Sequence, residues 1–362
     1  MKFLLAGYFG FGNFGDEAIL KYAFDILRFY YKNAQIEIVT QYPYLARKNF
    51  GVDGIYRFDI KKLISAIKSC DYLIFPGGSV LQDVTSLKSI LYYLGLIFCA
   101  NLFKRKVILL AQGVGPINNK LAQNLTYKLL KKAELITIRD EKSFNMLKNN
   151  GVSCELTADM LWAFTQNSSE PAKKEEIAFG EISCSVEKKK IGIQLRKWSD
   201  LTNEKLYILA KAVLKNFVYV EYDYKLICLQ KNSDEEIMVE FGKILHELAP
   251  EASIELYVEN DIEKNIELLQ QMDYMIAMRF HACLCAINAE KAVLTLSYDQ
   301  KTEEFCHELG LKYIDVRDFT AETVNSAMLW LKEFNPTRAA LKTNILVKKS
   351  QQNVDFLVKV IK

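Results

Sequence analysis

The sequence predicts an α/β protein built from two doubly wound parallel-sheet domains. Short apolar runs with strand character alternate with longer amphipathic stretches along the chain, a pattern typical of a parallel sheet with helices on both faces. The pattern stops once, between about Gln166 and Lys190, and then resumes. The 362 residues, half of them hydrophobic and a quarter charged, suffice for two ordinary cores and exclude a disordered chain.

Each half is expected to contain five buried strands, with a helical stretch behind each. In the first half the strands are Phe3–Gly7, Gln35–Thr40, Tyr72–Phe75, Val107–Ala111 and Leu135–Ile138, and the clearest helical patterns are Glu17–Tyr31 and Leu121–Lys132. In the second half they are Lys190–Leu195, Tyr224–Gln230, Ile254–Tyr257, Tyr274–Met278 and Ala292–Leu296. We therefore expect domains at residues 1–170 and 191–340, a linker at 171–190, and a last helix within 341–362 that packs back across the linker.

The charge is balanced overall but differs between the two halves. A net charge of +3 is too small for a general nucleic-acid binder. Residues 1–170 carry 21 Lys and Arg against 14 Asp and Glu, whereas residues 171–362 carry 26 against 30. A basic first half suits an anionic ligand or an anionic membrane surface, and scattered solvated lysines are the alternative.

Cysteine usage and hydropathy limit the compartment. The eight cysteines form no C-x-x-C pair, and with three histidines we expect no metal site. Most cysteines lie in apolar runs, which favours a reduced, cytoplasmic protein. The most lipid-like stretch, Ile90–Phe103, is about fourteen residues, short of the roughly 20 that span a bilayer. It is interpreted as a buried helix, with a membrane-touching face as the alternative.

The first strand is followed by a glycine-rich loop. Residues 10–15 form a literal G-x-G-x-x-G, the pattern of dinucleotide-binding loops. Asp16 and Glu17 follow at once and place two carboxylates where a pyrophosphate would sit on the helix dipole. We therefore favour a different role, in which Asn13 and Asp16 hydrogen-bond the hydroxyls of a sugar. The alternative is that Asp16 only caps the helix.

Ligands of open parallel sheets bind beyond the carboxyl ends of the strands, so the other loops at this edge are candidates too. Two adjacent glycines after Pro76 allow backbone N–H groups to approach a ligand closely, and polar side chains follow them. The residues concerned are Gly77, Gly78, Ser79, Gln82 and Asp83. Arg139 ends another strand beside two acids, where it forms either an exposed ion pair or a bidentate clamp on a carboxylate or phosphate.

In the second half the most informative positions are Arg279 and His281, where a strand meets a small-residue helix. A histidine at such a junction, two residues from an arginine, points to function rather than packing. Arg196 also ends a strand, with Trp198 beside it, and Asp299 and Lys301 follow a third strand. Several arginines, one histidine and no nucleophile–base pair suit a small, highly charged anion and acid catalysis.

Eight segments, in order along the chain, resemble the polysaccharide pyruvyl transferase family, particularly its CsaB-like members, which modify bacterial cell-wall polymers. The segments are GYFGFGNFGDEAIL (7–20), PGGSVLQDVTS (76–86), AQGVGP (111–116), IRDE (138–141), ADML (158–161), GIQLRKW (192–198), MRFHA (278–282) and SYDQK (297–301). Phe280 stands where the family has leucine in its Arg-Leu-His motif, and Pro76 replaces a glycine that commonly precedes the GGS turn.

The resemblance implies a GT-B-like fold, in which two Rossmann-like domains face a central cleft. It implies transfer of the enolpyruvyl group of phosphoenolpyruvate onto two hydroxyls of a sugar, which leaves a pyruvate ketal and releases phosphate. In the CsaB-like group the acceptor is N-acetylmannosamine on a lipid-linked glycan. No cofactor is then needed beyond this donor, and the enzyme would work in the cytoplasm, with peripheral contact at the inner face of the membrane.

The resemblance also gives the candidate residues roles. His281 is the expected acid or phosphate ligand, and Arg279 acts beside it. The phosphoenolpyruvate site comprises Arg139, Arg196, Gly77, Gly78 and Ser79 together with these two, on the side of the second domain. The acceptor side is the basic first domain, with Asn13, Asp16, Gln82 and Asp83.

Three other functions fit the same residues. They are a GT-B glycosyltransferase that uses a nucleotide sugar, a non-catalytic sugar- or anion-binding module, and a nicotinamide-dependent oxidoreductase. Ligand preference separates the first and the last from a pyruvyl transferase. Acceptor-dependent release of phosphate separates an enzyme from a binding module.

Overall fold

The structure, a computed structural model, describes residues 1–167 and 188–361 and divides the chain into two compact units. Unit 1 comprises Met1–Phe164 and Ile345–Lys362, and unit 2 comprises Thr165–Asn344. The expected linker at 171–190 lies outside the described residues except for its last three. Of these, residues 189 and 190 already belong to a strand.

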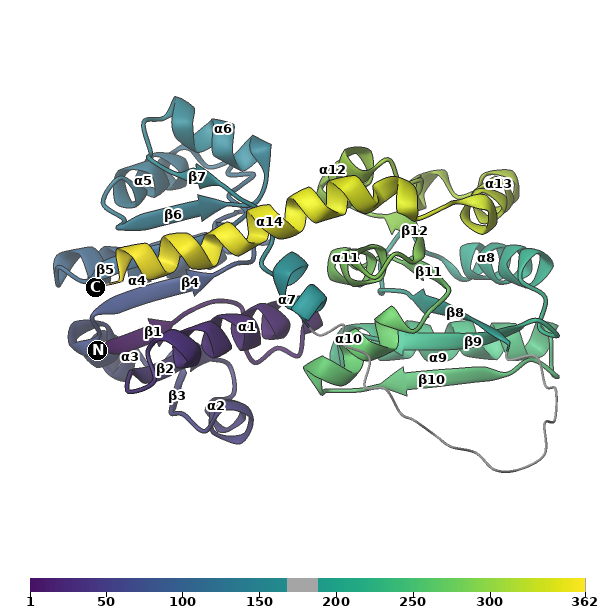
Figure 1. The fold of residues 1–362 in the computed structure, drawn as a ribbon, viewed down its shortest axis with the longest axis horizontal. Helices are drawn as coiled ribbons and strands as arrows, with labels where there is room; N and C mark the ends of the chain where they lie inside the picture. The colour runs from purple at the N-terminus through teal and green to yellow at the C-terminus, as the bar shows by residue number, and fades with distance from the viewer. Residues whose placement is uncertain (168–187, 362) are drawn as a thin grey trace. The chain divides into compact units, whose positions relative to one another are not determined.

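The described part of unit 1 is a doubly wound fold around a seven-stranded parallel sheet in the order β3-β2-β1-β4-β5-β6-β7 (Figure 1). Its strands are β1 (Lys2–Leu5), β2 (Gln35–Thr40), β3 (Gly54–Tyr56), β4 (Tyr72–Pro76), β5 (Lys106–Gln112), β6 (Leu135–Ile138) and β7 (Glu155–Leu156). Its helices are α1 (Phe14–Tyr30), α2 (Pro43–Phe50), α3 (Ile60–Ser69), α4 (Leu87–Leu102), α5 (Lys120–Leu130), α6 (Glu141–Asn149) and α7 (Leu161–Asn167).

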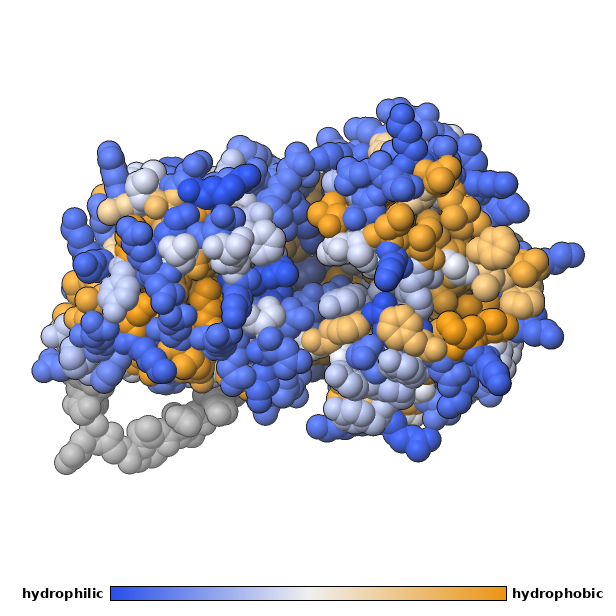
Figure 2. Space-filling view, turned by 180° about the vertical axis from the view of Figure 1, so that it is seen from behind, coloured by the Kyte–Doolittle hydropathy of each residue, from blue (hydrophilic) through white to orange (hydrophobic). Residues whose placement is uncertain are grey.

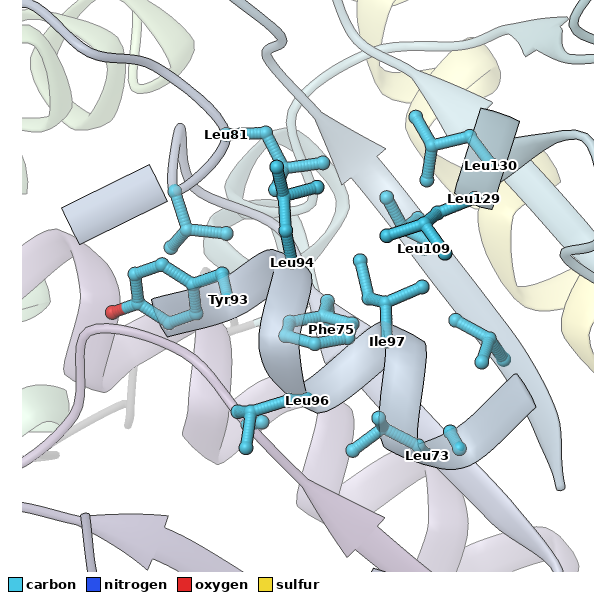
Figure 3. Close-up of a cluster of buried hydrophobic side chains, with 14 of the residues drawn as sticks. Leu73, Phe75, Leu81, Tyr93, Leu94, Leu96, Ile97, Leu109, Leu129 and Leu130 are labelled. Carbon is cyan, nitrogen blue, oxygen red and sulfur yellow. The ribbon is translucent and has the colours of Figure 1, made fainter. Parts of the chain in front are cut away.

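Helices cover both faces of this sheet, which is why the central strands are continuous apolar runs. Strand β4 is buried at every position, and β5 at all but Lys106. Alternate residues serve the two faces: Leu73 and Phe75 of β4 belong to the core under α3, α4 and α5. Figure 3 shows Tyr93, Leu94 and Ile97 of α4 packed in this core together with Leu73, Phe75 and other buried side chains.

Four of these helices begin where a polar side chain caps them. Asp59, Ser86, Asn119 and Asp140 each accept a hydrogen bond from a backbone N–H in the first turn of α3, α4, α5 and α6. The caps fix the first turns at the carboxyl edge of the sheet, because each helix runs antiparallel to the strands that it connects.

The described part of unit 2 repeats this architecture with a six-stranded parallel sheet in the order β10-β9-β8-β11-β12-β13. Its strands are β8 (Lys189–Gln194), β9 (Tyr222–Cys228), β10 (Ile254–Val258), β11 (Tyr274–Ala277), β12 (Ala292–Ser297) and β13 (Tyr313–Asp315). Its helices are α8 (Asn203–Asn216), α9 (Lys231–Leu248), α10 (Ile262–Gln270), α11 (Phe280–Asn288), α12 (Gln300–Leu309), the 3-10 turn η1 (Val316–Asp318) and α13 (Ala321–Glu333). The predicted class is therefore confirmed.

The last helix, α14 (Thr337–Val360), starts in unit 2 and ends in unit 1. Asn353 fixes its second part to unit 1. The Oδ1 atom of Asn353 accepts from the hydroxyls of Thr137 and Thr157, and its Nδ2 donates to the carbonyl of Ala158 at 3.0 Å. All of these groups are buried, so the Asn353 amide satisfies buried hydrogen-bonding groups of unit 1 and attaches α14 to it.

Both sheets reverse their strand order once, between β1 and β4 in unit 1 and between β8 and β11 in unit 2. At such a switch point the connections leave toward opposite faces of the sheet and leave a crevice beyond the carboxyl ends of the strands. The segments that flank these two points are 7–13 and 77–86 in unit 1, and 195–202 and 278–279 in unit 2.

Candidate functional site

In unit 1 the glycine-rich loop after β1 is occupied by a carboxylate of the protein itself. Glu17, in the first turn of α1, accepts a hydrogen bond from the N–H of Gly10 at 2.7 Å, and the N–H groups of Phe11 and Gly12 also interact with it. Gly10 has a φ of 82°, and a Cβ there would collide with the Thr40 hydroxyl. Because Glu17 takes the donors that a pyrophosphate would need, this loop does not fit a dinucleotide.

Glu17 also has unusual acidity. Burial raises the pKa of its carboxyl to about 7, against the effect of the Gly10 N–H bond, which lowers it; repulsion from Asp16 raises it further. A carboxyl that titrates near neutral pH at the carboxyl edge of a sheet is suited to take a proton from a hydroxyl group. Sequence reasoning treated Glu17 only as an obstacle to pyrophosphate and missed this property.

The predicted pair Asn13 and Asp16 lies together at the switch point of unit 1. The Asn13 amide donates to the Asp16 carboxylate. Asn13 is the N-cap residue of α1, so Asp16 is not the helix cap. The other Asp16 oxygen is 3.3 Å from the position that a Cβ on Gly78 would take, which places the carboxylate against the loop after β4.

The loops after β4 and β5 are joined to each other by backbone hydrogen bonds. The N–H of Gly113 donates to the carbonyl of Gly78 at 2.8 Å, and the N–H of Gly115 donates to Leu81 at 2.8 Å. Gly77 and Gly78 have φ values of 91° and 87°, a region that favours glycine. The adjacent glycines therefore form a fixed turn rather than a flexible one.

Arg139, at the end of β6, is held beneath these loops. Its Nη1 donates to the Asp159 carboxylate at 2.5 Å and its Nη2 to the Ser79 hydroxyl at 2.6 Å, with the two charged side chains 5 % and 3 % exposed. A Cβ on Gly113 would lie 2.6 Å from the Ser79 oxygen and 3.3 Å from the guanidinium. The structure thus brings together the predicted residues Ser79 and Arg139. It adds Asp159, which the ADML segment contained but to which no role was given.

Gln82 and Asp83 hold their own loop together. The Gln82 amide bonds Thr85 through both its oxygen and its nitrogen. The Asp83 carboxylate accepts from the backbone N–H groups of Asn118 and Asn119 at 2.9 and 2.7 Å, and these bonds lower the pKa of Asp83. Both side chains are therefore engaged in loop structure, and their acceptor role stays a prediction.

In unit 2 the switch point is built around a buried ion pair. Arg279 donates from Nε and Nη2 to the two oxygens of Asp234, at 2.6 and 2.5 Å, and these side chains are 9 % and 0 % exposed. Nη2 also reaches Gln230 at 2.8 Å and Ser233 at 3.0 Å, in the first turn of α9. The Nη1 atom of Arg279 donates to none of the described residues. Sequence reasoning missed Asp234, which pairs with an arginine 45 residues away.

His281 follows Arg279 in the first turn of α11 and is half-buried. Its ring packs edge-on against Phe280, with the centroids 4.9 Å apart, and the Lys301 ammonium lies 4.1 Å from the centroid of the Phe280 ring. Phe280, the residue that departs from the family's leucine, thus lies between the predicted histidine and the predicted lysine. Asp299 instead caps α12 through its bond to the N–H of Thr302.

Arg196 completes the cationic group at this edge. Its Nη1 donates to the Tyr298 hydroxyl at 2.9 Å, and its guanidinium lies 5.1 Å from the Tyr298 ring and 5.7 Å from the Trp198 ring. Tyr298 is half-buried, and its desolvation raises the pKa of its phenol, while the charges of Arg196 and Arg279 lower it. Arg196 and Arg279 therefore both act on Tyr298 beyond the ends of β8 and β11, and His281 follows Arg279 in the first turn of α11.

Each unit thus carries polar residues at its switch point. Among the described residues no group of three or more His, Cys, Asp or Glu side chains is placed to hold a metal ion. Two Rossmann-like units of this kind, each with polar loops at the reversal of its sheet, define a GT-B-like fold.

Comparison with solved structures supports this class. UDP-GlcNAc 2-epimerase from Methanocaldococcus jannaschii matches with a TM-score of 0.68 at 12% identity, over 99% of each chain. The Anabaena protein Alr3699/HepE in complex with UDP and glucose matches with a TM-score of 0.57 at 12% identity, over 99% of this chain and 100% of that one. At such identities the likeness shows the fold alone.

Sequence comparison identifies the family. The polysaccharide pyruvyl transferase family model matches residues 13–300, so the chain belongs to this family. The amylovoran biosynthesis protein AmsJ of Erwinia amylovora is 21% identical over 369 positions, which cover 86% of each chain. The resemblance that the eight segments indicated is confirmed, and the family supports a transferase of polysaccharide biosynthesis.

Proposed function

We propose that this protein transfers the enolpyruvyl group of phosphoenolpyruvate to a sugar of a surface-polysaccharide precursor and closes it into a pyruvate ketal. The observation that supports the proposal is that Arg196, Arg279 and His281 all follow the adjacent strands β8 and β11 at the switch point of unit 2, in a chain of the pyruvyl transferase family. Phosphoenolpyruvate offers a carboxylate and a phosphate, the two groups that guanidinium donors bind best. It is the donor substrate, and we propose no other cofactor.

The reaction needs an acid first. His281, as imidazolium, protonates the methylene carbon of phosphoenolpyruvate, and the central carbon becomes oxocarbenium-like. A sugar hydroxyl attacks this carbon and forms the first C–O bond, and its proton passes to a base. The C–O bond to phosphate then breaks, phosphate leaves, and a second hydroxyl attacks to close the ketal. Of the two hydroxyl protons, one restores the acid and so replaces the proton that His281 gave to the new methyl group. The other leaves with phosphate.

Arg279 acts in this scheme as an oriented donor. Asp234 takes its Nε and Nη2, so the guanidinium cannot rotate, and Nη1 is the donor left for a ligand. The buried, bidentate pair with Asp234 fixes the direction of the Arg279 guanidinium and adds little net positive charge to the site. Arg196, held only by one bond to Tyr298 and by aromatic rings, keeps more of its charge for the phosphate.

We assign the acceptor to unit 1. Asn13 and Asp16 offer an amide and a carboxylate to sugar hydroxyls. The pKa of Glu17, about 7, suits a base that takes a proton from a hydroxyl group near neutral pH. Gly77, Gly78, Ser79 and Arg139 form the fixed turn beside them. Gln82 and Asp83, in the loop that follows, are assigned to the acceptor side as well. The acceptor sugar that we propose is N-acetylmannosamine on a lipid-linked glycan.

We place the reaction in the cytoplasm. Six of the seven cysteines within the described residues are buried, where cysteine behaves as a small hydrophobe, and this supports a protein of a reducing compartment.

Calorimetry against three ligands tests the donor. Purified protein is titrated with phosphoenolpyruvate, with a uridine diphosphate sugar and with NAD. We expect heat of binding from phosphoenolpyruvate alone. Binding of the nucleotide sugar instead would mean that the fold serves glycosyl transfer, and binding without acceptor-dependent release of phosphate would mean a non-catalytic module.

Variants for this test should leave the buried Arg279–Asp234 pair intact. Arg279→Ala would leave the Asp234 carboxylate buried and uncompensated, so loss of binding would be confused with loss of the fold. Arg196→Ala removes a cation that has no acidic partner among the described residues, and should weaken binding of phosphoenolpyruvate. His281→Gln should lower kcat by about 10²–10⁴-fold, since general acid catalysis contributes that much, with binding retained. An unchanged kcat would remove His281 from the mechanism.

A further inference from the structure

On the outer surface of α3, α4 and α5 in unit 1, exposed leucine, isoleucine and phenylalanine side chains lie among lysines. On α4 the exposed positions are Lys88 and one helical stripe, Leu87, Leu91, Gly95, Phe98 and Leu102, with spacings of four, four, three and four. None of these residues belongs to the core cluster, into which Tyr93, Leu94 and Ile97 of the same helix pack (Figure 3). Helix α4 is thus apolar on both its core and its solvent side.

Neighbouring helices extend this surface, because α3 and α5 each pack against α4. We define the apolar patch as six residues between 41 % and 80 % exposed: Ile60, Leu87, Leu91, Phe98, Leu102 and Leu121. Seen from behind, unit 1 carries gathered hydrophobic side chains with hydrophilic ones around them (Figure 2). A contiguous exposed patch of this kind marks an interaction surface.

Basic residues surround the apolar patch, and acids are almost absent. Helices α3, α4 and α5 contain six lysines and no Asp or Glu. Over residues 60–133 eleven Lys and Arg stand against two Asp. Of these two, Asp71 accepts from the N-terminal strand at Lys2 and Asp83 is bound to Asn118 and Asn119. At the margins, Asp59 pairs with Lys62 and Glu134 with Lys106.

We propose that this surface docks unit 1 on an anionic phospholipid membrane. Leucine and phenylalanine side chains enter the boundary of the acyl chains, while lysines around them meet the lipid phosphates. No helix among the described residues is long and apolar enough to cross a bilayer. The first residues of α3, α4 and α5 lie at the carboxyl edge of the sheet, which puts one end of the patch beside the candidate site.

A second copy of the chain fits this surface less well. In a two-fold symmetric dimer the same surface meets itself, so lysines would face lysines with no acid between them. Lysine is also depleted in interfaces between proteins. An anionic lipid surface, in contrast, complements both the charge and the apolar residues.

Sedimentation with vesicles tests the proposal without any substrate. The full chain is mixed with vesicles of phosphatidylglycerol and phosphatidylcholine, or of phosphatidylcholine alone. We expect binding to the anionic vesicles, much less binding to the neutral ones, and release at about 1 M salt, where the Debye length is about 3 Å. Equal binding to both vesicles, or none to either, would overturn the proposal.

Two sets of variants locate the contact. The double variant Leu91→Glu/Phe98→Glu should reduce partitioning by at least about tenfold, because it removes two buried apolar anchors. The control is Leu341→Glu, at a leucine that is 74 % exposed in the unit 2 part of α14. Replacing Lys61, Lys68 and Lys88 by glutamine should reduce partitioning by about fivefold for each lysine. The matched triple on α8 and α9, Lys211, Lys215 and Lys243, should leave it unchanged.

Analytical ultracentrifugation of the same proteins decides between lipid and self-association. The protein is expected to stay monomeric through this surface. A dimer that Leu91→Glu/Phe98→Glu dissociates, with no vesicle binding by the parent protein, would show that a second copy covers the patch and would overturn the proposal. Because neither readout involves phosphoenolpyruvate, vesicle binding survives if the proposed reaction fails, and the reaction survives if vesicle binding fails.

Discussion

Replacing Glu17 by glutamine should remove a large part of the pH dependence of unit 1 stability. In the fold the pKa of Glu17 is raised to about 7, chiefly by burial, whereas the ordinary value is 4.5. Between these two pH values the unfolded chain has released the proton and the folded protein still holds it. The folded state therefore binds more protons, and the free energy of unfolding falls as pH rises.

The size of the effect follows from the two pKa values. Each pKa unit of difference between the folded and unfolded states corresponds to about 1.4 kcal/mol. As the pH rises from below 4.5 to above 7, the ionisation of Glu17 therefore lowers the free energy of unfolding by about 3 kcal/mol in total. The contribution is fully present below pH 4.5 and is lost as pH rises through about 7. Glutamine mimics the protonated carboxyl, keeps an oxygen for the Gly10 N–H, and does not titrate.

Tryptophan fluorescence separates the units in the assay. Trp162 is buried in unit 1, whereas Trp198 and Trp330 belong to unit 2. In a Trp198→Phe/Trp330→Phe background, urea unfolding followed by fluorescence reports unit 1 alone. The parent should lose about 3 kcal/mol relative to Glu17→Gln between pH 4.5 and 8. Parallel pH curves for the two proteins would refute the burial argument and show that Glu17 is ionised in an ordinary way.

Three further perturbations test the internal contacts. Asp234→Ala leaves Arg279 buried without its partner and should destabilise unit 2 by about 3–5 kcal/mol, read from the urea transition of Trp330 in a Trp162→Phe background. Asn353→Leu leaves the buried hydroxyl of Thr137 without its acceptor and should destabilise unit 1 by about 1–3 kcal/mol, with Ser350→Ala as a milder comparison. Gly10→Ala places a Cβ against Thr40 at a φ of 82° and should lower the thermal midpoint of unit 1, whereas Gly12→Ala, whose Cβ meets no atom within 4 Å, should lower it less. Equal midpoints for the two glycine variants would mean that backbone strain alone, and not the contact with Thr40, decides the effect.

The buried strands were predictable because burial on both faces leaves a continuous apolar run. All ten expected strands are present, from β1 to β12. The sequence did not predict β3, β7 and β13, which have two or three residues each and lie at or near the sheet edges, where a short run has no periodicity to recognise. Strand β9 ends at Cys228 rather than Gln230, because Gln230 serves as the N-cap residue of α9.

Within the candidate site the arginines were predictable and their partners were not. Arg139 and Arg279 end apolar strands, a position that a pattern can indicate. Asp159 and Asp234 reach them from 20 and 45 residues away, and an aspartate near the start of a helix is usually interpreted as a cap. Glu17 shows the same limit, since its raised pKa depends on how deeply the loop buries it.

The buried acidic partner of Arg139 changes how the positive charge of residues 1–170 is interpreted. Arg139 is paired with Asp159, so the site in unit 1 gains little net charge from it. Residues 60–133 carry eleven Lys and Arg against two Asp, whereas the rest of residues 1–170 carries ten against twelve. The positive excess therefore belongs to the segment of α3, α4 and α5 and not to the loops at the sheet edge. An anion that is attracted to this charge meets the helix surface first, which is the behaviour expected of a lipid headgroup rather than of a small substrate.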